Sequence, residues 1–338
     1  MAGPGRISEV EIIGDDWGQI QRSDRRPTAS GRRMHILASL KRAVFFSAIA
    51  CATSRASPLE TPFDFSRSEI GIEISIKGKT LYAIVDTGVD PSVIDLAAAD
   101  HLGLKVDRTN SGEAGGFGEG KGMTVFPTRI EGLSIHGHNF AGFDALASDT
   151  SAFTPADQRR IDVVLGYSFL SDKILLIDYV AQSLAILASP REVRARVRTC
   201  RTRWRVPLKT FDSYPVIPGF RLGEARDPVT LDTGSNGGIA LFAAALDLPG
   251  VKDSLIDQGA SIRKGARGES TVENFILNQP VGFGPFTLPA GQAVFVHKQQ
   301  GSAVARIANV GNAVLAAFKI KILLDYRSRA MSFYGDCL

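Results

Sequence analysis

The stretch LYAIVDTGVDPSVI, residues Leu81–Ile94, has a near copy in DPVTLDTGSNGGIAL, residues Asp227–Leu241. In both copies, β-branched and apolar residues run directly into the tripeptide Asp-Thr-Gly. This pattern predicts a buried strand that ends in a tight turn. A single Asp-Thr-Gly would be an ordinary turn signal, but a second copy in a matching setting needs another explanation.

A second pair of segments matches further along the chain. Residues 163–179 read VVLGYSFLSDKILLIDY, and residues 308–326 read ANVGNAVLAAFKIKILLDY. Gly166 lies 80 residues after the first Asp-Thr-Gly aspartate, and Gly311 lies 79 residues after the second. The sequence therefore predicts one structural unit that is present twice.

The remaining pattern is that of β-strands. GIEISIKG at 71–78 alternates apolar and polar residues before a turn, TVFPTRIEGLSIHGH at 124–138 is similar, and KILLIDYVAQSLAIL at 173–187 gives two apolar runs around a polar turn. We expect an all-β protein with two homologous β-barrel lobes, an N-terminal lobe over 57–195 and a C-terminal lobe over 196–338.

Short helices are expected after Gly166, after Gly311 and around Leu241–Leu246. Asp178 and Asp325 also form a repeated pair, but each lies at a predicted strand end before a turn. We therefore interpret both as structural residues.

The segment that joins the lobes is rich in arginine, REVRARVRTCRTRWRV at 191–206. Charged residues alternate with apolar ones, which favours an edge strand protected against stray pairing over a surface for anions or nucleic acid. The net charge of the chain is only +4. We expect no nucleic-acid partner.

The N-terminus predicts export. Residues 1–33 are polar and Arg-rich and are expected to be upstream sequence or disordered, whereas 34–56 have the layout of a signal peptide. The apolar run Ala43–Ala52 is about half as long as a spanning helix, so we expect no integral membrane span. Cys51 is a weak candidate for lipid attachment. The predicted location is periplasmic or secreted, and the alternative is a short buried helix in a cytoplasmic protein.

The chain has three cysteines and no Cys-x-x-Cys motif. If residues 34–56 are removed, Cys200 and Cys337 remain, and they either pair in an oxidising compartment or stay as two free thiols. His136 and His138 have no obvious third ligand and are expected in a solvated turn. We predict no metal and no cofactor.

The paired aspartates carry the predicted chemistry. Two carboxylates that share one proton can hydrolyse a peptide bond without a metal, because the ionised one accepts a proton from water and the protonated one donates to the carbonyl oxygen. Asp86 and Asp232 are the candidates for these roles. The residues expected to support their loops are Thr87, Gly88, Thr233, Gly234 and Ser235.

These motifs resemble those of the aspartic peptidase superfamily, and the resemblance implies that the two lobes have the acid-protease fold. Asp86-Thr87-Gly88 is followed by Val164-Leu165-Gly166, and Asp232-Thr233-Gly234 by Asn309-Val310-Gly311; the resemblance covers roughly residues 60–338. It implies that the two elements pack beneath the aspartate loops and that a peptide substrate lies in a cleft between the lobes. The short lobes and the repeated segments look closer to a fused retropepsin-like pair than to a digestive pepsin, and a monomer is expected.

Two departures from the family pattern affect the predictions. Asn309 interrupts the apolar element of the second copy. Val89 stands where the second copy has Ser235, whose hydroxyl could lower the pKa of a neighbouring carboxylate. We therefore predict activity at mildly acidic to near-neutral pH.

The resemblance also implies a flap over the substrate. The stretch GEAGGFGEGKG at 112–122 lies at the corresponding place, and Gly116, Phe117 and Gly118 would form its tip. A flexible surface loop is an equal alternative for this stretch.

Other enzyme classes fit less well. Residues 115–122 approach a phosphate-binding loop, but Gly122 stands where a Ser or Thr is needed, and no Gly-x-Ser-x-Gly nucleophile motif occurs. The competing function is a catalytically silent peptide-binding or scaffold protein on the same fold.

Overall fold

The structure is a computed structural model that describes residues 12–13, 59–151, 159–297 and 307–337. All of them belong to one compact unit, which comprises residues 1–18 and 58–338. The predicted signal peptide at 34–56 and the lipidation candidate Cys51 lie outside the described residues, as does all of 1–33 except Ile12–Ile13.

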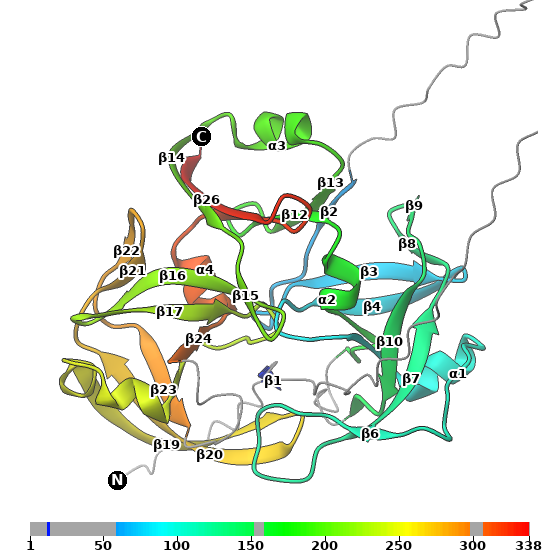
Figure 1. The fold of residues 1–338 in the computed structure, drawn as a ribbon, viewed down its shortest axis with the longest axis horizontal. Coiled ribbons are helices and arrows are strands. Elements are labelled where there is room, and N and C mark those ends of the chain that lie inside the picture. Colours follow the sequence, from blue (N-terminus) through cyan, green and yellow to red (C-terminus); the bar gives the residue numbers. More distant parts are fainter. Residues whose placement is uncertain (1–11, 14–58, 152–158, 298–306, 338) are drawn as a thin grey trace, which may run out of the picture. The chain divides into compact units, whose positions relative to one another are not determined.

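The first half of the chain forms a nine-stranded sheet, here called the N-terminal sheet (Figure 1). Its strands, in spatial order, are β6 (Gly112–Glu113), β7 (Thr124–Ile130), β10 (Phe143–Ser148), β5 (Ser92–Asp95), β11 (Val163–Leu165), β4 (Lys79–Val85), β3 (Gly71–Ile76), β8 (Leu133–Ile135) and β9 (His138–Asn139).

The second half forms an eleven-stranded sheet, the C-terminal sheet. Its strands, in spatial order, are β1 (Ile12–Ile13), β19 (Leu255–Gly265), β20 (Gly268–Leu277), β23 (Ala293–His297), β18 (Ile239–Phe242), β24 (Ala308–Val310), β17 (Ala225–Leu231), β16 (Tyr214–Leu222), β21 (Val281–Phe283) and β22 (Phe286–Leu288), and β15 (Thr210–Phe211) pairs with β16.

The two sheets share one connectivity. From β19 to β22, each strand of the C-terminal sheet takes the place of a strand of the N-terminal sheet, in the same spatial order. The parallel pairs correspond as well: β4 with β11 matches β17 with β24, and β5 with β10 matches β18 with β23. The predicted all-β fold with two matching lobes is confirmed, and in the described part of the chain each sheet ends at edge strands and does not close into a barrel.

A six-stranded sheet, the joining sheet, connects the halves. Its strands, in spatial order, are β14 (Cys200–Pro207), β26 (Ala330–Cys337), β25 (Lys321–Asp325), β12 (Ile174–Asp178), β13 (Ser183–Leu187) and β2 (Leu59–Pro62). β12 from the first half pairs antiparallel with β25 from the second. All five residues of β12 are buried, which explains why this strand is almost continuously apolar in sequence.

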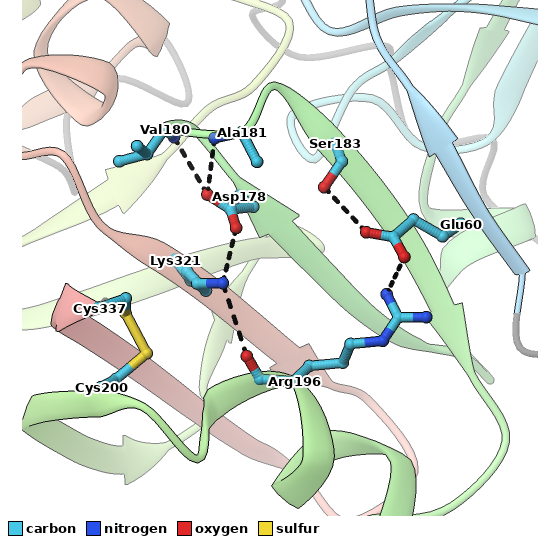
Figure 2. Close-up of polar contacts among 9 residues, drawn as sticks. All are labelled: Glu60, Asp178, Val180, Ala181, Ser183, Arg196, Cys200, Lys321 and Cys337. Atoms are coloured by element: carbon cyan, nitrogen blue, oxygen red, sulfur yellow. Dashed lines mark hydrogen bonds and ion pairs between the residues drawn. A yellow bond between two sulfur atoms is a disulfide. The ribbon is translucent and has the colours of Figure 1, made fainter.

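The two aspartates of the joining sheet are structural, as the sequence predicted. Asp178 Oδ1 accepts hydrogen bonds from the backbone N–H groups of Val180 and Ala181, at 3.1 and 3.0 Å (Figure 2). Asp325 does the same for the N–H of Ser328, at 2.9 Å. Each side chain thus closes the turn that follows its strand.

Further contacts tie this sheet together. Cys200 and Cys337 form a disulfide between β14 and β26. Lys321 Nζ lies 2.7 Å from Asp178 Oδ2, and Arg196 forms an ion pair with Glu60 (Figure 2). Among the described residues, no helix is long and apolar enough to span a membrane.

The predicted short helices are confirmed. α2 (Tyr167–Leu170) starts directly after Gly166, α4 (Asn312–Ala317) starts directly after Gly311, and a 3-10 helix, η2, covers Ala243–Asp247. The remaining short helices of the two halves are α1 (Leu96–His101) and the 3-10 helix η3 (Lys252–Ser254).

The arginine-rich segment is only partly the predicted edge strand. Its first part is a helix, α3 (Pro190–Val197), because a capping motif outweighs the two-residue alternation. Ser189 Oγ accepts from the N–H of Glu192 at 3.4 Å, and Glu192 Oε2 accepts from the N–H of Ala188 at 3.0 Å. The second part is β14, which lies at the edge of the joining sheet with its arginines exposed, as expected.

Candidate active site

The two Asp-Thr-Gly aspartates occupy equivalent positions. Asp86 directly follows β4, and its N–H donates to Leu165 O of β11 at 3.1 Å. Asp232 directly follows β17, and its N–H donates to Val310 O of β24 at 3.1 Å. Each aspartate loop is therefore attached to the strand that ends in Gly166 or Gly311.

The threonines of the two loops exchange hydrogen bonds. Thr87 N–H donates to Thr233 Oγ1 at 3.0 Å, and Thr233 N–H donates to Thr87 Oγ1 at 3.1 Å. Each hydroxyl in turn donates to a carbonyl of the opposite half, Thr87 to Leu231 O at 2.9 Å and Thr233 to Val85 O at 2.8 Å. All four bonds are buried, so they join the two loops rigidly.

Both carboxylates lie against Gly234. Asp86 Oδ1 accepts from Gly88 N at 2.7 Å, and Asp232 Oδ1 accepts from the N–H groups of Gly234 and Ser235 at 2.9 and 3.1 Å. A Cβ atom on Gly234 would lie 2.1 Å from Asp86 Oδ2, so only glycine leaves room for this carboxylate. Asp86 and Asp232 are 3% and 0% exposed.

Ser235 and Val89 lie in corresponding places, each packed against the glycine of the element below. A Cβ on Gly311 would lie 2.7 Å from Ser235 Oγ, and one on Gly166 would lie 2.7 Å from Val89 Cγ1. The bond that Ser235 makes to the carboxylate of Asp232 comes from its backbone N–H. The predicted effect of its hydroxyl on pH dependence stays a prediction.

Beneath the second loop lies the side-chain amide of Asn309, the residue that interrupts the apolar element of the second copy. Asn309 is 1% exposed, and its Nδ2 lies 3.4 Å from Asp232 Oδ2. Asn312 supports the same loop, since its Nδ2 donates to Thr233 O at 2.7 Å and its Oδ1 accepts from Tyr179 Oη at 2.7 Å. In the sequence, the presence of asparagines in a repeated element that is otherwise apolar was the signal that could have indicated these contacts.

A third carboxyl near the site was missed from the sequence. Val85 N–H donates to Ile70 O at 3.0 Å, so the antiparallel pairing of β3 and β4 brings Glu69 close to Asp86. Glu69 is 1% exposed, and Arg67 Nη2 lies 3.0 Å from its Oε2. Burial raises the pKa of Glu69 to about 7, and the charge of Asp86 adds to the effect, while Arg67 opposes it.

The predicted flap residues lie in the loop between β6 and β7. Gly116 and Gly118 have φ values of 126° and 122°, which favour glycine. Phe117 is 0% exposed, and its ring centroid lies 6.5 Å from that of Phe295 and 5.3 Å from that of His297, both on β23. Its side chain is therefore buried against the C-terminal sheet.

The backbone of this loop also bonds to the hairpin of β19 and β20. Arg267 N–H donates to Phe117 O at 2.9 Å, Gly120 N–H donates to Arg267 O at 2.7 Å, and Met123 N–H donates to Ala266 O at 3.1 Å. Loop and hairpin occupy corresponding places in the two halves, and they are joined here.

Within the described residues, no group of three or more His, Cys, Asp or Glu side chains is placed to hold a metal ion. His136 lies exposed in the turn between β8 and β9, where the sequence predicted it, and its Nε2 is 2.9 Å from Thr61 Oγ1.

Two comparisons with known proteins gave matches. Residues 72–169, which include the first Asp-Thr-Gly loop, match the family model described as aspartyl protease. The fold resembles the crystal structure of an aspartic proteinase from Irpex lacteus, with a TM-score of 0.51 and 8% sequence identity, over 82% of this chain and 97% of that one. No curated protein matches the sequence significantly.

At 8% identity the structural likeness shows the fold alone, whereas the family match rests on sequence in the first half. Together the two findings support the assignment of the chain to the aspartic peptidase superfamily.

Proposed function

We propose that the protein is an aspartic endopeptidase in which Asp86 and Asp232 activate a water molecule. The observation that carries this proposal is the position of both carboxylates against Gly234, in loops that Thr87 and Thr233 hold together. Two carboxylates this close do not both ionise fully, so they hold one proton between them near neutral pH.

The reaction follows from that shared proton. The ionised carboxylate removes a proton from water while the water oxygen bonds to the scissile carbonyl carbon, and the protonated carboxyl donates its proton to the carbonyl oxygen. The tetrahedral intermediate then loses its C–N bond as the nitrogen takes the proton held by the first carboxylate, while one of its two hydroxyls returns a proton to the second carboxylate and the carbonyl double bond re-forms. The pair ends with one proton, as it began, and no metal is needed.

Access to the site requires movement in this proposal. Both aspartates are almost fully buried, and the loop that carries Phe117 is bonded to the β19–β20 hairpin. The loop with Gly116, Phe117 and Gly118 would act as a flap that opens to admit a peptide and closes over it, which excludes water during the reaction.

The finer assignments are also proposals. The common strand order of the two sheets supports an internal duplication with lobes at 57–195 and 196–338, in the style of a fused retropepsin-like pair. Since one chain supplies both aspartates, a monomer suffices. The disulfide of Cys200 and Cys337 supports an oxidising compartment, in line with a signal peptide at 34–56.

The test is cleavage of a quenched fluorescent peptide library over roughly pH 3 to 8, a range around the carboxyl and imidazole reference values. We expect cleavage by the wild type, inhibition by a statine-type inhibitor, and loss of at least about a hundredfold in Asp86→Asn and Asp232→Asn. Asp212→Asn is the matched control, because Asp212 is exposed in a turn at φ 45°, which Asn also tolerates.

Two outcomes would refute the proposal. Equal cleavage by the wild type and both site variants would show that the activity does not depend on Asp86 and Asp232. Binding of the inhibitor without cleavage of any peptide would favour the silent peptide-binding protein.

A further inference from the structure

Asn309 stands at a place that the fold makes apolar. It lies in β24, between β17 and β18, and is 1% exposed. The corresponding residue of the N-terminal sheet is Val164 in β11. Because burial of an amide is costly unless the amide is hydrogen-bonded, Asn309 needs defined partners.

The partners fix the orientation of the amide. Thr230 is paired with Asn309 across the parallel strands β17 and β24. Its hydroxyl contacts two acceptors, Asn309 Oδ1 and Ala308 O, the second at 3.2 Å. A hydroxyl donates one hydrogen, and when it donates to Oδ1 the amide N–H of Asn309 faces Asp232.

Three N–H groups therefore face the carboxylate of Asp232. Its Oδ1 accepts from the N–H groups of Gly234 and Ser235, and its Oδ2 faces Asn309 Nδ2 at 3.4 Å. An N–H group stabilises the ionised form of a carboxyl and cannot accept a bond from the protonated form. At the corresponding place near Asp86, Val164 has methyl groups, which make no such bond.

Among the titratable groups around the pair, one carboxyl acts in the same direction and two tyrosines stay neutral. Glu69 and Tyr326 interact with Asp86, and Tyr179 interacts with Asp232. Burial raises the pKa of both tyrosines far above the ordinary value, so both stay neutral. Glu69 adds negative charge beside Asp86 as it ionises, and this charge favours a proton on Asp86.

We infer that Asn309 is a positioning residue that makes the pair unequal, so that Asp232 is the ionised base and Asp86 holds the shared proton. The inference rests on the proposed function for its mechanistic meaning. In the first step, Asp232 then removes the proton from water as the oxygen bonds to the carbonyl carbon, and Asp86 gives its proton to the carbonyl oxygen.

The test exchanges the two corresponding residues. Asn309→Val copies the first half, and the double variant Val164→Asn/Asn309→Val moves the amide beneath the other loop. The carboxyl carbons of Asp86 and Asp232 are followed by ¹³C NMR titration of the full-length protein, with assignment by their loss in Asp86→Asn and Asp232→Asn. The pH profile of kcat/KM is recorded on the same proteins.

In Asn309→Val we expect the lower apparent pKa of the pair to rise by about one unit, since a hydrogen bond to a charged group is lost. The acidic limb of kcat/KM moves up by the same amount, which is about a tenfold loss on that limb, while KM on the plateau stays unchanged. In the double variant we expect Asp86 to become the residue that ionises first.

Thr230→Val keeps Asn309 but removes the hydroxyl that orients it, and it serves if Asn309→Val does not fold. We expect a shift in the same direction. Unchanged titration of Asp232 in the folded single variants would overturn the inference. If the titration of Asp232 shifts but neither the wild type nor any variant cleaves peptides, the proposed function fails and the inference on proton placement stands.

Discussion

The exchange between Thr87 and Thr233 gives the strongest prediction about stability. Thr87→Ala removes a hydroxyl that donates to Leu231 O at 2.9 Å and accepts from Thr233 N at 3.1 Å. Both partners are buried, and each buried group left without a partner costs about 1–3 kcal/mol. The expected loss is therefore about 2–6 kcal/mol, a large share of the ~5–15 kcal/mol that stabilises a typical domain.

Urea unfolding followed by tryptophan fluorescence measures this loss. Trp204 packs against Phe283 and Phe333, with ring centroids 5.6 and 5.5 Å apart, so its emission reports on the second half. Thr87→Ser is the matched control, because it keeps the hydroxyl and loses one methyl group. We expect the serine variant to lie within about 1 kcal/mol of the wild type.

A double-mutant cycle with Thr233→Ala tests whether the two residues act as one unit. Since Thr87 N–H and Thr233 Oγ1 share one bond, and the reverse pair shares another, the two losses should not add. We also expect kcat to fall more than KM changes, because small displacements of catalytic groups are costly. If Thr87→Ala were as stable as Thr87→Ser, the two loops would not depend on this exchange.

Three further predictions concern other parts of the molecule. The pKa of Glu69 is raised from 4.5 to about 7, so the stability that its protonated form contributes below pH 4.5 is lost as the pH rises through 7. Glu69→Gln should therefore remove about 3 kcal/mol of the pH dependence of the unfolding free energy, measured in urea. Equal pH profiles for wild type and variant would contradict this. Replacement of Cys200 and Cys337 by serine should lower the free energy of unfolding by about 4–5 kcal/mol, as expected for a cross-link over 137 residues, and should make stability insensitive to reductant. Phe117→Ala should speed hydrogen exchange at the amide of Arg267, because the loop loses its buried anchor, and unchanged exchange would show that the backbone bonds alone hold the loop closed.

The strands were predictable because each shows either an alternation of apolar and polar residues or an apolar run bounded by turns. The hairpin of β3 and β4 and the fully buried β12 follow directly from alternation and from an apolar run bounded by turns. The same rule failed at α3, where alternation of Arg with Val and Ala indicated a strand. The signal that decided the local structure was the Ser189-Pro190-Arg191-Glu192 start, which caps a helix.

The repeat alone identified the two candidate aspartates and the threonines beside them. It could not show which side chains of distant segments touch these aspartates, since register and orientation across sheets are set by packing of the whole chain. Glu69 gave no sequence signal of its own, because its burial and its proximity to Asp86 arise from the pairing of β3 with β4.

The sequence by itself thus determined the number of halves, most of the strands and the pair of acidic loops, because these depend on local periodicity and on repetition. The tertiary structure decided how the halves are joined, where Phe117 is buried, and that Asn309 lies against one carboxyl of the pair. Those features depend on contacts between residues far apart in the chain, and a contact of that kind leaves no periodic trace in the residues that make it.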